Sequence, residues 1–310
     1  MIRNVLRSLI VVVLVAAALV RPLQAQGDPS LIPLRGNAPR ILAWDAVLQG
    51  DDAYELRWPV AVAAASAGEI AVADAYGSRL VVFSGTGSTW TAERSLTLPG
   101  VPLALTHDGE RYVLSLRQGA GLVALEGPDF KLRRLPLPAA TVPGAVAAAA
   151  RGGGILLYDL AGGEVLALEA DGGVAGKTPV AAELTALTAA PDDGFYAVFA
   201  AAAQVRRYGP NGEELGRWAV PGAGPVPAWP AGVVVEPGGD LLLADRHGGR
   251  IVVLDAGGKI SGLGSRRGWE PGLLLLPAGM ARLPDARLAV ADQGNGRVQI
   301  FRRIDRERSP

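Results

Sequence analysis

Short apolar runs separated by turn residues recur along most of this chain. In residues 230–255 the runs and the turns between them are, in order, Gly232 to Val235, Pro237-Gly238-Gly239, Leu241 to Ala244, His247-Gly248-Gly249 and Ile251 to Leu254. Apolar runs of about 4–6 residues bounded by Gly and Pro predict β-strands. These runs are apolar nearly throughout, which is typical of sheets covered on both faces. After a further turn, the more polar segment from Lys259 to Leu263 predicts a fourth strand.

This four-stranded unit is repeated along the chain. Residues 59–83, 230–255 and 277–301 follow one pattern closely, and weaker copies fill the middle of the chain. The residues that open the third strand of the six copies are Arg79, Gly121, Glu164, Gln204, Arg250 and Arg297, at spacings of 42, 43, 40, 46 and 47 residues. Four-stranded units at roughly 40–45 residues are typical of propeller blades. The sequence therefore predicts an all-β fold, a six-bladed β-propeller of four-stranded antiparallel blades.

The two ends of the repeat region complement each other. The sixth unit stops near Phe301, after its third strand, and so lacks an outer strand. Residues 40–44 precede the first unit and resemble the fourth-strand segment at residues 216–220. We therefore expect residues 40–47 to close the last blade, because closure removes an exposed sheet edge. Deleting residues 38–57 is then expected to destabilise that blade.

The three strong copies resemble the NHL repeat family. The family pattern is a Pro-x-Gly opening, an apolar strand ending in Ala-Asp, a short turn with Asn or Gly, and Arg-Ile/Val-x-x-Phe. The matching segments are Pro277-Ala278-Gly279, Val290-Ala291-Asp292, Asn295, Arg297-Val298, Phe301, Pro230-Ala231-Gly232, Ala244-Asp245, Arg250-Ile251, Ala73-Asp74, Arg79 to Phe83 and the connector from Gly262 to Gly272. The resemblance covers residues 40–301. It implies a propeller scaffold, but NHL-like propellers include binding proteins as well as metal-dependent lyases and lactonases, so the resemblance does not select a function.

The N-terminal residues have the pattern of a secretory signal peptide. Arg3 and Arg7 precede twelve apolar residues from Leu9 to Val20, and Ala25 precedes a polar residue. A basic start, a short apolar core and a small residue before the cleavage site are typical of such signals. Twelve residues are fewer than the roughly 18–20 that span a bilayer. We therefore expect cleavage after Ala25 and a periplasmic or secreted protein; the alternative is an uncleaved N-terminal anchor. The predicted division is a signal peptide at residues 1–25, a linker at 26–39, the propeller at 40–301 and a charged tail at 302–310.

Composition narrows the classes of function. The chain has no cysteine, which excludes disulfides and lipid attachment to a cysteine. It carries 30 basic and 30 acidic side chains, and the predicted signal peptide holds three basic ones and no acidic one, so cleavage leaves 27 basic against 30 acidic. A slightly acidic chain argues against general nucleic-acid binding, which depends on a basic surface. We expect a monomer that binds no nucleic acid and, after cleavage, no membrane.

Charged residues recur at one turn of each strong copy. An aspartate ends the second strand and an arginine opens the third, five residues later. The pairs are Asp74 with Arg79, Asp245 with Arg250 and Asp292 with Arg297. A catalytic site does not need three copies around a ring. We therefore expect these residues to be structural, through pairing within each turn or through carboxylate bonds to turn amides.

Metal-dependent catalysis has little support in the sequence. The chain has two histidines, too few for a three-histidine zinc site of the amidating-lyase kind. By the repeat register, His107 and His247 also fall in turns at opposite ends of the ring. We expect both to be surface turn residues. The predicted inner strands are Val60 to Val62, Leu103 to Leu105, Ala145 to Ala147, Leu184 to Leu187, Val233 to Val235 and Met280-Ala281. They carry almost no oxygen side chains, and Glu183 and Glu236 alone do not make a calcium cage. We expect no cofactor, with calcium as the open alternative.

Aromatic residues mark one face of the predicted ring. Trp58 and Trp229 each precede the proline that opens a first strand, and Trp269 lies in a connector between blades. Connectors emerge on the same face as the turns between second and third strands. Two interpretations stay open: the tryptophans fill the junctions between blades, or they bind a ligand together with arginine and amide groups. The candidate binding residues are Trp58, Tyr76, Trp229, Arg246, His247, Trp269, Gln293 and Asn295.

Two classes of function follow from these observations. The leading hypothesis is an exported, non-catalytic propeller that binds a protein, peptide or glycan partner through this face. The alternative is a divergent metal-dependent hydrolase or lyase of the lactonase-like kind, against which the missing axial ligands argue. A structural subunit of an envelope complex is a third possibility, because the middle copies are rich in alanine. We favour a protein without a catalytic residue.

Overall fold

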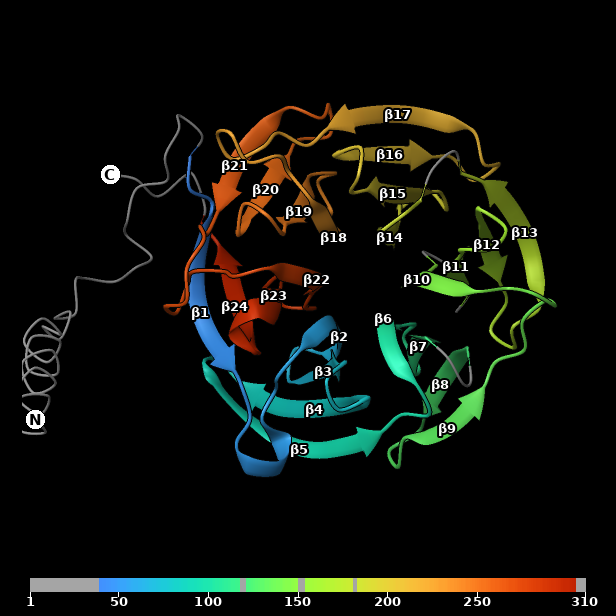
Figure 1. The fold of residues 1–310 in the computed structure, drawn as a ribbon, viewed down its shortest axis with the longest axis horizontal. Coiled ribbons are helices and arrows are strands. Elements are labelled where there is room, and N and C mark those ends of the chain that lie inside the picture. The colour runs from blue at the N-terminus through green and yellow to red at the C-terminus, as the bar shows by residue number, and fades with distance from the viewer. Residues whose placement is uncertain (1–38, 118–120, 150–153, 181–182, 305–310) are drawn as a thin grey trace, which may run out of the picture.

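Six four-stranded antiparallel sheets form a ring around a central axis (Figure 1). The computed structural model describes residues 39–304, except for residues 118–120, 150–153 and 181–182. The strands of blades 1 to 3 are β2 (Pro59–Ser66), β3 (Glu69–Asp74), β4 (Arg79–Thr86), β5 (Thr89–Thr97), β6 (Val101–His107), β7 (Tyr112–Arg117), β8 (Leu122–Glu126), β9 (Lys131–Arg134), β10 (Pro143–Ala148), β11 (Ile155–Asp159), β12 (Glu164–Leu168) and β13 (Val174–Pro179). Those of blades 4 to 6 are β14 (Ala186–Ala189), β15 (Phe195–Phe199), β16 (Gln204–Tyr208), β17 (Glu214–Ala219), β18 (Pro230–Val235), β19 (Leu241–Asp245), β20 (Arg250–Leu254), β21 (Ile260–Gly264), β22 (Pro277–Arg282), β23 (Leu288–Asp292), β24 (Arg297–Arg303) and β1 (Leu42–Leu48). The predicted fold class is confirmed.

The outer strand of blade 6 is β1, which precedes blade 1 in the sequence. β1 pairs antiparallel with β24, from Leu42 opposite Arg303 to Leu48 opposite Val298, and the two strands lie side by side in Figure 1. The sequence predicts this strand at residues 40–47. β24 also continues two residues beyond Phe301, the predicted end of the propeller, because β1 supplies it with hydrogen-bonding partners.

The apolar core is divided among the junctions between neighbouring blades. Along β3, Ile70 and Val72 pack against blade 6, whereas Ala71 and Ala73 pack against blade 2. Successive side chains of a strand point to opposite faces of its sheet. Each face is covered by another sheet here, which explains why the strand sequences are apolar throughout rather than alternating.

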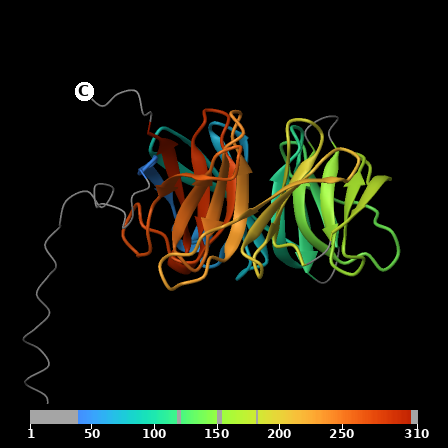
Figure 2. The same ribbon diagram turned by 90° about the horizontal axis from the view of Figure 1, so that it is seen from above.

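The ring has two different faces, which Figure 2 shows with the ring edge-on. The connector face carries the connectors between blades and the turns between second and third strands. The hairpin face carries the turns between first and second strands and between third and fourth strands. The first strand of every blade therefore begins at the connector face and ends at the hairpin face.

Several strand boundaries differ from the sequence predictions, and three of them have a clear local reason. The first strand of blade 4 begins at Ala186 rather than Leu184, because Leu184 is buried in the junction with blade 3 as part of the connector. The third strand of blade 2 begins at Leu122, since Gly121 is in a left-handed turn conformation with φ of 72°. The fourth strand of blade 5 is shifted by one residue toward the C-terminus and begins at Ile260.

The predicted signal peptide at residues 1–25 lies outside the described residues. The predicted linker at residues 26–39 is described only at Pro39, and the predicted tail at residues 302–310 only as far as Ile304. In the described part of the chain, no helix has the length and apolar character needed to cross a membrane.

Candidate functional site

A buried aspartate holds the connector of blade 6 onto the turn beneath it. The carboxylate of Asp292 accepts hydrogen bonds from the backbone N–H of Leu275 at 2.7 Å and from the side chains of Asn295, Arg297 and Gln299 at 2.8 Å each. Burial raises the pKa of the Asp292 carboxyl, and the bonds from Leu275, Asn295 and Arg297 oppose that shift. One buried carboxyl group thus joins the connector to the turn after β23.

The same arrangement recurs in blades 1 and 5. Asp74 accepts the N–H of Trp58 at 2.8 Å, and Asp245 accepts that of Trp229 at 3.1 Å. In all three blades the arginine that opens the third strand pairs with the aspartate, at N–O distances of 2.9, 3.0 and 2.8 Å for blades 1, 5 and 6. Each arginine also donates to connector carbonyls, which belong to Ala53 and Glu55 for Arg79, to Pro221 for Arg250, and to Glu270 and Leu273 for Arg297. We term each pair an Asp–Arg clamp.

The remaining blades lack a complete clamp. In blade 3, Asp159 accepts the N–H groups of Val142 at 2.9 Å and Ala161 at 3.0 Å, without an arginine partner. Leu116 and Phe199 take the corresponding positions in blades 2 and 4, judged by strand pairing. Asp159 is absent from the sequence predictions because Glu164 stands where the strong copies have arginine.

Aromatic side chains project from the clamped connector face. Trp269 is 74% exposed, Tyr76 is 69% exposed and Trp58 is 44% exposed. The guanidinium of Arg57 lies over the Tyr76 ring, 5.0 Å from its centroid. All of these residues lie in two connectors, residues 49–58 and 265–276, or in the turn after β3.

These connectors pack onto one continuous surface over blades 6 and 1. The turn after β23 lies between them, and each of two glycines in this turn contacts a different connector. A Cβ atom at Gly294 would lie 2.7 Å from the Leu275 side chain, and one at Gly296 would lie 2.9 Å from the Leu56 carbonyl oxygen. Approaches this close leave no room for a side chain, so the turn joins the two connectors into a single packed layer.

Three further candidate residues lie on the connector face over blade 5. The ring of Trp229, which is half-buried, lies 5.3 Å from the exposed ring of His247. Arg246 donates to the carbonyl oxygen of Leu276 at 3.3 Å, and burial lowers the pKa of Arg246. Arg246 therefore contacts the connector of blade 6, and the half-buried Trp229 offers only part of its surface to a ligand.

Two candidate residues are less exposed than the sequence predicts: Gln293 is buried and Asn295 is half-buried. Gln293 is only 4% exposed. The amide nitrogen of Asn295 donates both to Asp292 at 2.8 Å and to the Gly268 carbonyl at 3.0 Å. The contacts of the blade 6 clamp hold this turn against the connector. No pattern in the sequence indicates that Gln293 is buried there.

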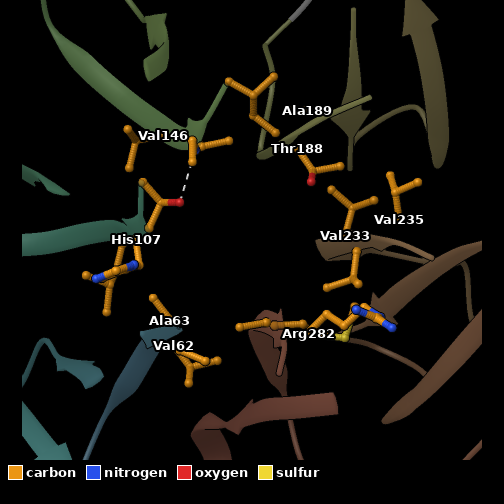
Figure 3. A pocket seen from close by; sticks show the side chains of 18 residues that line it. Val62, Ala63, His107, Val146, Thr188, Ala189, Val233, Val235 and Arg282 are labelled. Atoms are coloured by element: carbon orange, nitrogen blue, oxygen red, sulfur yellow. Dashed lines mark hydrogen bonds between the residues drawn. The ribbon is translucent and has the colours of Figure 1, made fainter. Parts of the chain in front are cut away.

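A channel runs along the axis of the ring. Its middle is lined by one apolar side chain from the first strand of each blade, which we term the collar: Val62, Leu105, Val146, Leu187, Val233 and Met280. On the connector side of the collar the cavity is about 80 Å³, and on the hairpin side it widens to about 250 Å³. We term this wider part, shown in Figure 3, the channel mouth.

The polar groups of the channel mouth come from the last residues of the first strands. They belong to Thr106, His107, Thr188 and Arg282. The Thr106 hydroxyl accepts the N–H of Ala148 at 3.0 Å, drawn as a dashed line in Figure 3. The sequence predictions missed Thr106, Thr188 and Arg282 because the predicted inner strands of blades 2, 4 and 6 end before β6, β14 and β22 do. The signal was present as a polar pair, Thr106-His107, directly after an apolar run.

His107 differs from the surface turn residue that the sequence predicts. It is half-buried at the channel mouth, and its ring packs edge-on against Tyr112 with 4.8 Å between centroids. Its Nδ1 accepts the N–H of Gly109 at 3.2 Å. Burial lowers the pKa of His107, while the carboxylates of Asp108 and Glu69 act in the opposite direction.

Acidic groups are not gathered at the axis. Among the described residues, no three His, Cys, Asp or Glu side chains are grouped so that they could hold a metal ion. Glu183 lies in a connector and Glu236 directly follows β18, so the two are at opposite ends of the channel. Glu236 pairs with Arg303 at 2.6 Å, and burial raises the pKa of its carboxyl.

Comparison with known proteins identifies the fold and no family. No known protein-family model matches the chain, and no curated protein sequence matches it. Solved structures do. A protein of unknown function from Bacteroides thetaiotaomicron has a TM-score of 0.64 at 14% identity, over 85% of this chain and 76% of its own. An auxiliary nutrient binding protein from the same organism has a TM-score of 0.64 at 10% identity, over 86% and 77%. A streptogramin B lyase has a TM-score of 0.60 at 10% identity, over 85% and 98%.

The chain shares the fold of these proteins. At identities of 10–14% the similarity extends to the arrangement of blades and to nothing more. The same fold thus serves a protein named for nutrient binding and one named as a lyase. Function must therefore be argued from the residues of this chain.

Proposed function

We propose that this protein is an exported, non-catalytic scaffold that binds a partner protein through the connector face of blades 6 and 1. The observation that carries the proposal is the exposure of Trp58, Tyr76 and Trp269, which are 44%, 69% and 74% exposed on one packed surface. Trp, Tyr and Arg are enriched among the residues that dominate binding energy between proteins. Arg57 over the Tyr76 ring adds the third residue type to this surface.

The shape of this surface favours a macromolecule. Small-molecule sites are concave and bury most of their ligand. Neither the narrow nor the wide part of the channel is lined by Trp58, Tyr76 or Trp269. These side chains stand on a surface that crosses a blade junction, and such a surface fits the broad contact of two proteins.

The clamps support binding by limiting the flexibility of the connectors. Ordering a mobile loop on association lowers affinity, so a loop that is already ordered binds at less entropic cost. Asp74 and Arg79 hold the connector that bears Trp58, and Arg297 donates to Glu270, the neighbour of Trp269. The aromatic side chains are thus displayed from backbone that is fixed before a partner arrives.

The proposal includes four finer statements. The chain is an NHL-type propeller, which the clamp residues in blades 1, 5 and 6 support. It is exported after cleavage behind Ala25, so the N-terminal residue of the purified protein should be Gln26. It acts as a monomer. It holds no resident metal, in keeping with the apolar collar. An enzyme of the lyase kind would need ligands that the described part of the channel does not offer.

Site-specific crosslinking tests the proposed face. A photoreactive phenylalanine derivative is placed at Tyr76 or Trp269 and, as matched controls, at Leu132 or Leu215, which are 39% and 53% exposed on the outer strands β9 and β17. In the envelope and secreted fractions of the source cells, we expect a discrete protein adduct from the connector face only. With the purified partner, Trp269→Ala should weaken binding by about tenfold or more.

The outcomes separate the candidate partners. Adducts that form equally from the Leu132 position would show non-specific contact and contradict the proposal. A glycan array is probed in parallel with the wild type and Trp269→Ala. Glycan binding that this substitution abolishes would replace the protein partner with a carbohydrate at the same face.

A further inference from the structure

We propose that the channel mouth is a second binding site, separate from the connector face, which takes a small organic carboxylate anion with an apolar body. The carboxylate is held by Arg282 and Thr188, and the apolar body rests on the collar. The site opens on the hairpin face, so the proposal is independent of the protein-binding surface on the connector face.

Arg282 is the main support for an anionic ligand. Its Nε atom is buried and has no hydrogen-bond partner, and the guanidinium makes no hydrogen bond or ion pair with any described residue. The arginines of the clamps, in contrast, each pair with a buried aspartate. A buried donor without an acceptor costs free energy that a ligand acceptor would recover. Guanidinium binds a carboxylate through two parallel, charge-assisted bonds.

The charge of Arg282 is not neutralised within the mouth. None of the 18 residues that line it is a carboxylate. Outside the mouth, Glu236 on blade 5 lines an adjoining cavity at the rim together with Arg282. Burial raises the pKa of the Glu236 carboxyl, and the charge of Arg282 acts in the opposite direction. Glu236 is itself paired with Arg303 at 2.6 Å, so its charge is already engaged outside the mouth.

Thr188 on blade 4 supplies a second polar group to the mouth that Arg282 lines from blade 6. Figure 3 shows its hydroxyl directed into the pocket, and no hydrogen bond to that hydroxyl is present among the described residues. Val235, on the blade between them, lines the adjoining cavity at the rim together with Arg282. A carboxylate in the mouth therefore has a donor on each side of the end of β18.

Small side chains make the room for such a ligand. Alanines occupy the mouth on blades 1, 3 and 4, at Ala63, Ala64, Ala147, Ala148 and Ala189. The volume of about 250 Å³ is just below the usual range for drug-sized ligands, so the ligand is small. The floor is the collar, which includes Leu105, Leu187 and Met280 and offers only apolar contact. These features select a short carboxylate with a hydrocarbon or aromatic body.

Benzoate and butyrate, with their uncharged amides as matched probes, test the site. In calorimetric titrations of the full chain, benzoate should bind about tenfold or more tightly than benzamide, since a bond to a charged group is the stronger kind. Met280 is one of only two methionines, the other being Met1, so a methyl-labelled sample reports directly on the collar. The Met280 methyl resonance should move with benzoate.

Variants assign the effect to named groups. Arg282→Gln should remove the preference for benzoate over benzamide, Arg282→Lys should keep part of it, and Thr188→Val should weaken benzoate binding by about fivefold. Arg302→Gln, an exposed arginine on β24, is the matched control and should change nothing. Melting temperatures verify that each variant is folded.

Three results would overturn the proposal. Equal affinities for benzoate and benzamide would show that no charge is recognised. Unchanged benzoate binding by both Arg282 variants would assign the carboxylate to another site. A Met280 methyl resonance that stays still during a calorimetrically observed titration would place the ligand outside the channel.

Discussion

Two parts of the ring hold their connectors in different ways. Blades 5, 6 and 1 follow connectors of 10, 12 and 10 residues, and each has an Asp–Arg clamp. Blades 2 and 4 follow connectors of 3 and 6 residues and have Leu116 and Phe199 in place of the aspartate. Blade 3 is intermediate, with a connector of 8 residues and Asp159 without an arginine.

This gradation follows from the hydrogen-bonding needs of the backbone. Every connector residue carries a C=O group, and every one except proline an N–H group, without a strand partner, and those near the core need a partner from elsewhere. A buried carboxylate accepts from the N–H groups, and its arginine donates to the carbonyl oxygens. A connector of 3 residues leaves few such groups, so its blade can use an apolar residue at the same position.

Blades 2 and 4, which lack a clamp, each contain a pair of stacked aromatic rings. Tyr112 stacks on Phe130 with 6.0 Å between centroids, and Phe195 stacks on Tyr208 at 4.8 Å. Phe130 has a φ of 53° at the turn position that the next three blades fill with Gly172, Gly212 and Gly258. A left-handed conformation costs a non-glycine residue about 1–2 kcal/mol. The stack with Tyr112 and the guanidinium of Arg94, 5.1 Å from the ring centroid, offset that cost.

The largest effect is expected where the clamped half of the ring is closed. A chain that begins at Gln49 lacks β1 but keeps the carbonyl groups that Arg79 binds. It loses Leu42 and Leu48, which are 2% and 1% exposed, and it exposes the edge of β24. The free energy of unfolding should fall by more than the roughly 2–5 kcal/mol typical of one buried leucine. Urea unfolding measures the loss, with Leu132→Ala on the outer strand β9 as the control. An unchanged midpoint would show that β1 does not stabilise the ring.

Single aspartate substitutions test the gradation among blades directly. Asp292→Ala should lower the free energy of unfolding by about 3–5 kcal/mol, because it leaves Arg297 buried without its carboxylate. Asp159→Ala should cost about 1–3 kcal/mol, since two amides lose an acceptor but no arginine is left unpaired. Asp255→Ala is the control, because Asp255 accepts similar turn amides on the hairpin face at the surface, and should cost less than about 1 kcal/mol. Equal losses for Asp292 and Asp159 would remove the distinction between complete and partial clamps.

Lowering the pH is expected to have a smaller effect on stability, through His107 in blade 2. Burial lowers the pKa of His107 below its ordinary value of 6.5, so the folded protein binds this proton less tightly than the unfolded chain does. The stability that this provides is present above pH 6.5 and is lost as the pH falls through that value toward the lowered pKa. His107→Gln should therefore flatten the decrease in melting temperature between pH 7.5 and 5. His247→Gln, on the connector face, is the matched control. The same flattening in both variants would contradict a specific role of His107.

No effect is expected from removal of metal ions. We expect the carboxylate and arginine groups to hold the long connectors without a cation. The clamp carboxylates already accept bonds from amides and arginines, for example those from Trp58 and Trp229. Chelator followed by calcium should leave the melting temperature unchanged. A bound metal in the untreated protein, with a clear rise in melting temperature on adding calcium, would favour the lactonase-like alternative.

Much of the ring could be predicted from local patterns. The third strands of blades 3 and 4 begin at Glu164 and Gln204, the positions inferred from the repeat pattern. The clamp residues were recognisable because the same acidic and basic residue types recur at the same turn. Asp159 was not recognisable in this way, because its blade lacks the arginine that completes the pattern. The burial of Gln293 was also hidden, since the connector that the clamp holds against this turn lies more than fifteen residues away in the sequence.

The amino-acid sequence by itself determined the strands, their number and the positions of the turns. These depend on side-chain period and on Gly and Pro, which act within a few residues of chain. Only the tertiary structure decided which side chains meet at the axis. Thr106, Thr188 and Arg282 lie on three different blades and become neighbours of one cavity when the ring closes. The physical reason is that the channel is built from the ends of six strands far apart in sequence, so no local pattern records it.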